Sequence, residues 1–172
     1  MMSYLLEEDI ALNLATKSKH SALSKIAVRI ARRAGLHEQM VFNSLWHRER
    51  LGSTGIGHGI ATPHALFDTL SCPVASFTRL YPPIDFGGPD DDPVDIVYTM
   101  LWPGAAVSAF LPALSQVCRA LRTPLIREEL RQAHSAAEVI AILSGDPTRG
   151  ISNPRPCQAN AGTVEPTELS DA

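Results

Sequence analysis

The sequence is poor in cysteine, in aromatic residues and in excess charge of either sign. Its 172 residues include only three cysteines, Cys72, Cys118 and Cys157, which are widely spaced and form no CxxC pair. This number and spacing argue against a disulfide framework and a zinc site, and they suit a reducing compartment. The net charge is −3 and there is no long basic run, which argues against nucleic acid as a partner.

The sequence also has no obvious membrane or export signal. No apolar run is expected to span a bilayer, and the first nine residues are acidic and lack the apolar core of a signal peptide. Hydrophobic residues make up 45% of the chain and charged residues 19%, which is ordinary for a globular protein of this length. We therefore expect a cytoplasmic protein without membrane insertion.

Strand-like and helix-like patterns alternate through residues 1–145. Strands are expected at 10–14, 60–62, 74–80 and 94–102, where apolar residues alternate or β-branched and aromatic residues gather. Helices are expected at about 23–34, 37–50 and 110–121, from Thr123-Pro124 onward, and from Ser135 to about Gly145. The alternation predicts an α/β fold: a single domain with a mixed β-sheet flanked by helices on both faces.

Two segments differ in composition from these elements. Residues 81–93 are dense in Pro, Gly and Asp, which predicts a surface loop. Residues 146–172 are rich in Pro, Gly, Ser, Thr and Asn and have few large apolar residues. We expect them to form a disordered C-terminal tail outside a domain that spans residues 1–145.

One segment, residues 48–65, combines the residue types that phosphoryl transfer requires. Four of the eight residues from 52 to 59 are glycine, so backbone N–H groups can approach an anion closely. Ser53 and Thr54 add hydroxyl donors, and Arg48 offers a planar fork for phosphate oxygens. His64 follows Pro63 beside this loop, and a neutral imidazole is a competent nucleophile. The loop is neither a Walker motif nor a dinucleotide fingerprint, so spacing alone only suggests a phosphoryl carrier.

The same segment resembles the signature of the fructose/mannitol/nitrogen-type IIA family of the bacterial phosphoenolpyruvate-dependent phosphotransferase system. The resemblance extends over about residues 5–144, through a Pro-Ile-x-Phe run at 83–86, a Pro-Val-Asp run at 93–95 and the stretch after Trp102-Pro103. The Gly-Ser-Thr-Gly loop resembles the nitrogen-regulatory branch. The residues that carry the signature are Arg48, Glu49, Gly52, Ser53, Thr54, Gly55, Gly57, Gly59, Ile60, Ala61, Pro63 and His64.

The resemblance implies a phosphotransferase component that works without cofactor or metal. His64 would carry the phosphoryl group as tele-phosphohistidine, received from a small histidine phosphocarrier protein, and Arg48 would neutralise phosphate charge. The phosphorylation state would then regulate partners such as transporters or kinases. Phosphate binding would be completed by Ser53 and Thr54, with Gly55, Gly57, Gly59, His58 and Pro63 in supporting roles.

Two positions depart from the family pattern. Thr62 stands where the family usually has an aliphatic residue, which is a mild change because Thr also suits a strand. Phe110 aligns with a second histidine that faces the active one in the family. Phenylalanine cannot donate a hydrogen bond, so phosphorylation of His64 would proceed with altered stability or rate. His58 is one residue that could substitute for the missing histidine.

Two other functions stay open from the sequence. The chain could be a protein-binding module that keeps the fold and carries no phosphoryl group, a reading that Phe110 favours. It could also be a metal-dependent hydrolase using His58, His64 and Asp68, although no pattern for a third convergent ligand supports this. The acidic run Asp90-Asp-Asp92 lies between prolines and is interpreted as a solvated turn.

Overall fold

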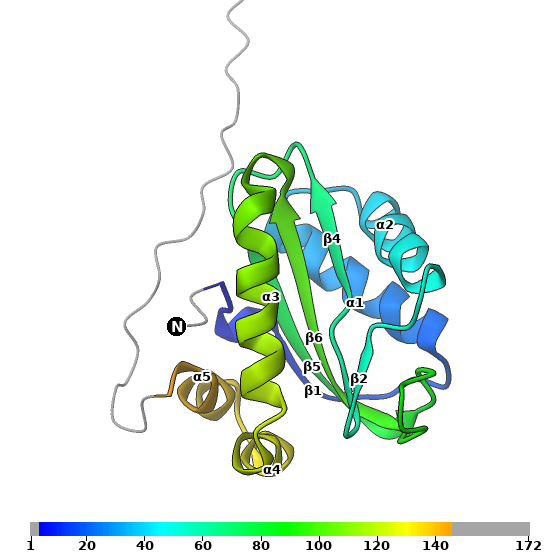
Figure 1. Ribbon diagram of the computed structural model, residues 1–172, viewed down its shortest axis with the longest axis vertical. Helices are drawn as coiled ribbons and strands as arrows, with labels where there is room; N and C mark the ends of the chain where they lie inside the picture. The colour runs from blue at the N-terminus through cyan, green and yellow to red at the C-terminus, as the bar shows by residue number, and fades with distance from the viewer. Residues whose placement is uncertain (1–3, 146–172) are drawn as a thin grey trace, which may run out of the picture.

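The computed structural model describes residues 4–145, which fold into a mixed six-stranded sheet between two layers of helices (Figure 1). The strands are β1 (Ile10–Leu14), β2 (Gly55–Gly57), β3 (Ile60–Ala61), β4 (His64–Phe67), β5 (Val74–Ile84) and β6 (Val94–Pro103). The helices are α1 (Lys19–Ala34), α2 (Glu38–Arg50), α3 (Val107–Leu121), α4 (Pro124–Gln132) and α5 (Ala136–Ser144), with short 3-10 turns η1 (Glu7–Asp9) and η2 (Gly104–Ala106).

The sheet is organised around β6. The strand order is β1-β5-β6-β3-β2, and β4 also pairs with β6 on the side of β3. β5 runs antiparallel to β6, whereas β3 and β4 run parallel to it one after the other. This succession places the β3–β4 connection beside β6, where His64 pairs with Met100.

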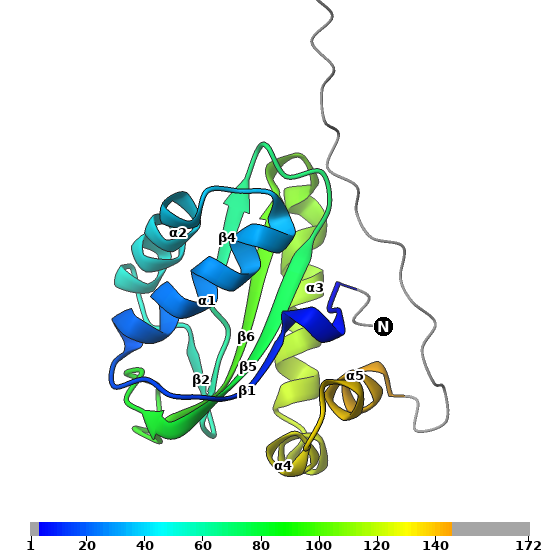
Figure 2. The ribbon, with the colours of Figure 1, turned by 180° about the vertical axis from the view of Figure 1, so that it is seen from behind.

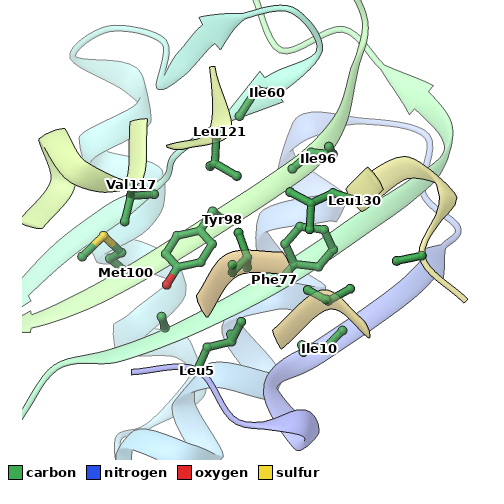
Figure 3. Close-up of a cluster of buried hydrophobic side chains, with 14 of the residues drawn as sticks. Leu5, Ile10, Ile60, Phe77, Ile96, Tyr98, Met100, Val117, Leu121 and Leu130 are labelled. Atoms are coloured by element: carbon green, nitrogen blue, oxygen red, sulfur yellow. The ribbon is translucent and has the colours of Figure 1, made fainter. Parts of the chain in front are cut away.

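Both faces of β6 are buried, because helices cover the sheet on both sides. Ile96, Tyr98 and Met100 pack with α3, α4 and α5 in one cluster, which Figure 3 shows around Phe77 and Val117. Alternate residues of the same strand point the other way and pack with α1 and α2. Figure 2 shows these two helices in front of the sheet. The near-continuous apolar run of β6 is what a strand buried on both faces requires. The predicted fold class is confirmed.

The structure confirms the helix ends that glycine predicted and corrects other boundaries. Gly35 and Gly145 have φ values of 66° and 67°, the left-handed conformation that ends α1 and α5. The predicted 81–93 loop was partly wrong, because β5 continues to Ile84 and pairs there with Val94. The expected glycine loop contains β2, β4 was not predicted, and α3 begins three residues before Phe110. The predicted tail, residues 146–172, lies outside the described residues.

Two expectations need correction, one about apolar stretches and one about the cysteines. Among residues 4–145, the stretch Gly104–Leu121 is long and apolar enough to cross a membrane by length and composition alone. Within this domain the stretch forms η2 and α3 and contributes Phe110, Val117 and Leu121 to the core. Cys118 is a free thiol, as expected, but Cys72 is disulfide-bonded.

Candidate functional site

His64 is the first residue of β4, which follows β3 along β6 after a break of two residues. β3 ends at Ala61, and the chain rejoins β6 at His64, which pairs with Met100. The carbonyl of Pro63 accepts a hydrogen bond from the N–H of Met100 at 3.0 Å, so the segment between β3 and β4 is held against β6. Pro63 suits this place because its ring fixes φ and its missing N–H is not required for pairing. The imidazole is thereby held half-buried in a fixed position.

The two ring nitrogens of His64 have different partners, and these partners define the tautomer. Nδ1 lies 2.9 Å from the carbonyl oxygen of Thr62, which can only accept, so Nδ1 carries the proton. Arg48 donates from Nε to Nε2 at 3.0 Å, so Nε2 presents its lone pair. The arrangement therefore makes Nε2 the nucleophilic atom and places a guanidinium beside it.

The surroundings of His64 favour the neutral ring. Burial is the largest cause that lowers the pKa of His64 below the usual histidine value, and the positive charge of Arg48 lowers it further. The bond to the Thr62 carbonyl and the negative charge of Glu49 act in the opposite direction. The net lowering keeps Nε2 unprotonated at neutral pH, which a nucleophile needs.

Arg48 lies in the last turn of α2 and faces an open cavity of about 510 Å³. Its Nη1 donates to the carbonyl of Gly52 at 3.0 Å, which ties the guanidinium to the glycine-rich loop. His64 lines the same cavity, and the exposed side chains of Leu51 and Leu66 stand at its edge. A phosphoryl group on Nε2 would therefore have both space and a positive charge next to it.

Phe110, near the start of α3, packs against His64 as the sequence alignment predicted. The ring centroids are 5.2 Å apart at an angle of 51°, and Phe110 is only 6% exposed. Trp102 also packs against Phe110, with ring centroids 5.8 Å apart, and its Nε1 donates to the carbonyl of Ala106. Phe110 thus forms an apolar wall of the site and contributes to the burial of His64.

Ser53 and Thr54 lie in the loop that follows α2, but their hydroxyl groups are already engaged. Ser53 Oγ donates to the carbonyl of Phe86 at 2.7 Å. Thr54 Oγ1 donates to Glu49 Oε2 at 2.5 Å. Each hydroxyl would have to leave its present acceptor before it could donate to a phosphate, so their phosphate-binding role stays a prediction.

Gly57 ends β2, and His58 and Gly59 form the turn that leads to β3. All three have positive φ values, 87°, 58° and 76°. A Cβ on Gly59 would lie 2.6 Å from Nη2 of Arg131 and 2.8 Å from Oδ1 of Asp95, so glycine is required there. These residues support the hairpin that carries β3 and Pro63, and they do not contact His64.

Gly55 supports the site differently. A Cβ there would lie 3.0 Å from the Cα of Gly88, so glycine allows the loop after α2 to approach a second loop closely. Sequence reasoning assigned no role to this approach, which brings residues 53 and 86 together.

The structure does not bring His58 to His64. The carbonyl of Gly59 is bonded to Asp95 N, whereas His64 pairs with Met100. Five residues of strand, about 16 Å, separate those two partners. His58 therefore does not replace the donor that Phe110 lacks.

His58 instead lies beside the acidic run. Its imidazole and the carboxylates of Asp90 and Asp92 offer ligand atoms within 4.8 Å of one another, and all three residues are exposed. Asp90 also accepts a hydrogen bond from the N–H of His58 at 2.6 Å, which is the largest cause that lowers the pKa of Asp90. Neither His64 nor Asp68 belongs to this group, so the three residues of the hydrolase hypothesis do not converge.

Sequence reasoning missed two groups on the elements that border His64. Glu49 was part of the matched signature, yet its role as a buried acceptor beneath the loop was not foreseen. The exposed apolar side chains Leu51, Leu66, Val107 and Leu111 were also missed. Their signal was present, since large apolar residues stand on elements next to the signature, but single exposed leucines are common and carry little information by themselves.

Comparison with known proteins identifies the family of the chain. Residues 3–145 match the family model of the phosphoenolpyruvate-dependent sugar phosphotransferase system, EIIA 2. The chain therefore belongs to that family of phosphotransferase-system components.

Within the family, the chain is similar to nitrogen regulatory proteins. It is 37% identical over 134 residues to the nitrogen regulatory protein of Bradyrhizobium diazoefficiens, covering 78% of this chain and 88% of that protein. Identity to the Klebsiella oxytoca nitrogen regulatory protein is 39% over 130 residues, 74% of this chain and 80% of that one. The crystal structure of nitrogen regulatory protein IIA-Ntr from Neisseria meningitidis aligns with a TM-score of 0.79 and 34% identity, over 81% of this chain and 96% of that one.

Proposed function

We propose that this protein carries a phosphoryl group on Nε2 of His64 and regulates partners according to its phosphorylation state. The observation that carries the proposal is the pairing of an unprotonated Nε2 with Arg48 at the edge of an open cavity. The phosphoryl donor is a histidine phosphocarrier protein, as the family resemblance implies.

The transfer needs few groups from the protein. The Nε2 lone pair forms a bond to phosphorus as the bond from phosphorus to the donor's histidine nitrogen breaks, and the bonding electrons return to that nitrogen. Arg48 turns from Nε2 to the phosphoryl oxygens and neutralises their charge. Nδ1 keeps its proton and its bond to the Thr62 carbonyl, which holds the ring while the ring becomes cationic.

The surface around the site supports a protein as the donor. Leu51 is 73% exposed, Leu66 45%, Val107 53% and Leu111 69%, and they lie on the elements that border His64. Exposed apolar groups around a reactive atom suit transient docking of another protein. We infer a cytoplasmic setting, where the donor and regulated targets such as transporters or kinases would meet it.

A binding module without phosphoryl transfer is the second candidate. Phe110 favours it, because an apolar ring stands where the family has a second histidine, and among the described residues Arg48 is the one side-chain donor in contact with His64. Such a module would use the same exposed apolar surface in its unphosphorylated form.

Phosphorylation in vitro separates the two candidates. The purified chain is incubated with phosphoenolpyruvate, the general enzyme I and the organism's own histidine carrier proteins, and intact mass is recorded. We expect one acid-labile phosphate on the wild type and on His58→Ala, and none on His64→Ala. His58→Ala is the matched control, since His58 lies on the hairpin away from the site. Absence of phosphate on the wild type would overturn the carrier function and leave the binding module.

A further inference from the structure

Glu49 is a buried carboxylate that the proposed transfer does not use. It follows Arg48 in the last turn of α2, and its side chain is only 2% exposed. Lys19, at the start of α1, donates from Nζ to Glu49 Oε1 at 2.9 Å. A buried charge is costly unless it is paired and fully hydrogen-bonded, so this carboxylate has a defined task.

Among residues 4–145, the other hydrogen-bond donors to the Glu49 carboxylate all belong to Thr54. The backbone N–H of Thr54 donates to Oε1 at 3.2 Å and to Oε2 at 3.1 Å, and the hydroxyl donates to Oε2. One side chain of α2 thus holds both the backbone and the side chain of the loop residue at position 54. Hydrogen bonds to an ionised acceptor are stronger and more directional than neutral ones, which makes this an effective clamp.

The clamp continues to His64 through Thr62. The carbonyl of Thr54 accepts from the N–H of Thr62 at 2.9 Å and from its hydroxyl at 3.4 Å. The carbonyl of Thr62 in turn accepts from Nδ1 of His64 at 2.9 Å. An unbroken series of contacts therefore runs from Glu49 through Thr54 and Thr62 to the ring of His64.

We propose that Glu49 is the positioning residue of this site: through Thr54 it fixes the Thr62 carbonyl that sets the tautomer and orientation of His64. The proposal rests on the phosphoryl-carrier function for its kinetic consequence. Its structural consequence, the proton on Nδ1, holds whether or not the protein is phosphorylated. Thr54 acts in this scheme as a link and not as a phosphate ligand.

The charge of Glu49 adds to its positional effect. Its negative charge raises the pKa of His64, against the lowering by burial and by Arg48. Once Nε2 carries a phosphoryl group and Nδ1 keeps its proton, the ring is cationic. A fixed carboxylate beneath the loop then stabilises that cation, as an acid partner does for an imidazolium in other sites.

The test uses Glu49→Gln in the full chain, with Glu38→Gln as the matched control. Glu38 lies on the same helix in its exposed first turn and pairs loosely with Arg32 at 3.6 Å, so it tests the same chemical change away from the site. Two readouts are taken: the ¹⁵N NMR shifts of the His64 ring across pH, and kcat and KM for phosphorylation by the carrier protein.

For Glu49→Gln we expect a mixed tautomer and a lower pKa of His64, because the clamp is weakened and a negative charge is lost. We expect kcat to fall about tenfold, as for outer partners that orient a reactive ligand. KM for the carrier should stay within about twofold, because Glu49 is buried and does not reach the surface. Glu38→Gln should match the wild type in all four quantities.

Thr54→Val and Thr54→Ser guard against a variant that fails to fold. Valine keeps the shape and removes the hydroxyl, so it should shift the tautomer and lower kcat in the same direction, and serine should restore both. A loss of thermal stability in Glu49→Gln with unchanged tautomer, pKa and kcat would overturn the proposal and leave a structural ion pair. If the wild type accepts no phosphate but Glu49→Gln still alters the His64 tautomer, the carrier function fails and the positioning role stands.

Discussion

Replacement of Phe110 by alanine should weaken the fold and raise the pKa of His64 together. The ring is only 6% exposed and contacts both His64 and Trp102, so its removal deletes core contacts and the apolar wall of the site. Burial is the largest cause of the lowered His64 pKa, and water entering beside the ring would relieve it.

The size of the stability loss follows from the position of the ring. Buried Phe→Ala changes cost about 3–5 kcal/mol, and one side of Phe110 borders an open cavity that water can fill. We therefore expect about 3 kcal/mol. For a domain of this size that corresponds to a Tm lower by roughly 6–12 °C. Leu111→Ala is the control, because Leu111 is adjacent on α3 and 69% exposed, and a surface change should stay within about 0.5 kcal/mol.

The lowered pKa of His64 also makes the stability of the fold depend on pH. A histidine whose folded pKa is lowered stabilises the fold fully above its unfolded value of about 6.5, and that stability is lost as pH falls toward the folded pKa. In Phe110→Ala the folded pKa moves up toward the unfolded value, so this loss should shrink. NMR titration of His64 and thermal unfolding between pH 5 and about 8 measure both quantities. A variant whose Tm and His64 pKa both equal those of Leu111→Ala would refute the assignment of Phe110 as the wall of the site.

Three further changes test other parts of the structure. Arg48→Gln should raise the pKa of His64, because a nearby positive charge is lost. It should also slow phosphoryl acceptance about 100-fold, as measured by quenched-flow mass analysis. A wild-type rate would contradict the proposed charge neutralisation. Burial raises the pKa of Asp9 to about 6, so the stability that its neutral form contributes is present below about 3.8 and lost as pH rises to about 6. Asp9→Asn should remove that loss, so urea titrations at about pH 4 and about pH 7 should show a smaller fall in unfolding free energy than in the wild type, and an equal fall would contradict the assignment to Asp9. His58→Asn should raise the unfolding free energy by about 0.5–1 kcal/mol, because asparagine tolerates a φ of 58° in a tight hairpin better than histidine does. A lower unfolding midpoint in urea would show that the imidazole is needed there.

Much of the fold could be predicted because the periodicities are local. Leu23, Ile26 and Ile30 repeat at helical spacing and are all buried in α1, and Gly35 ends the helix in the left-handed conformation. β6 has an almost continuous apolar run because helices cover both of its faces. β2 and β4 escaped prediction since three or four residues carry no period, and they become strands only through pairing with β3 and β6.

By itself, the sequence determined the candidate reactive residues and their order along the chain. His64, Arg48 and the glycine-rich loop lie within 17 residues, so a local signature names them, and they fall inside the residues 3–145 that the family model matches. The tertiary structure alone decided which groups surround them. Phe110 reaches His64 from 46 positions away and Lys19 reaches Glu49 from 30, whereas His58, only six positions from His64, is carried off by the β2–β3 hairpin. The physical reason is that pairing with β6 and close packing of α1 and α3 on the sheet, which no local pattern encodes, set the distances between side chains that are remote in sequence.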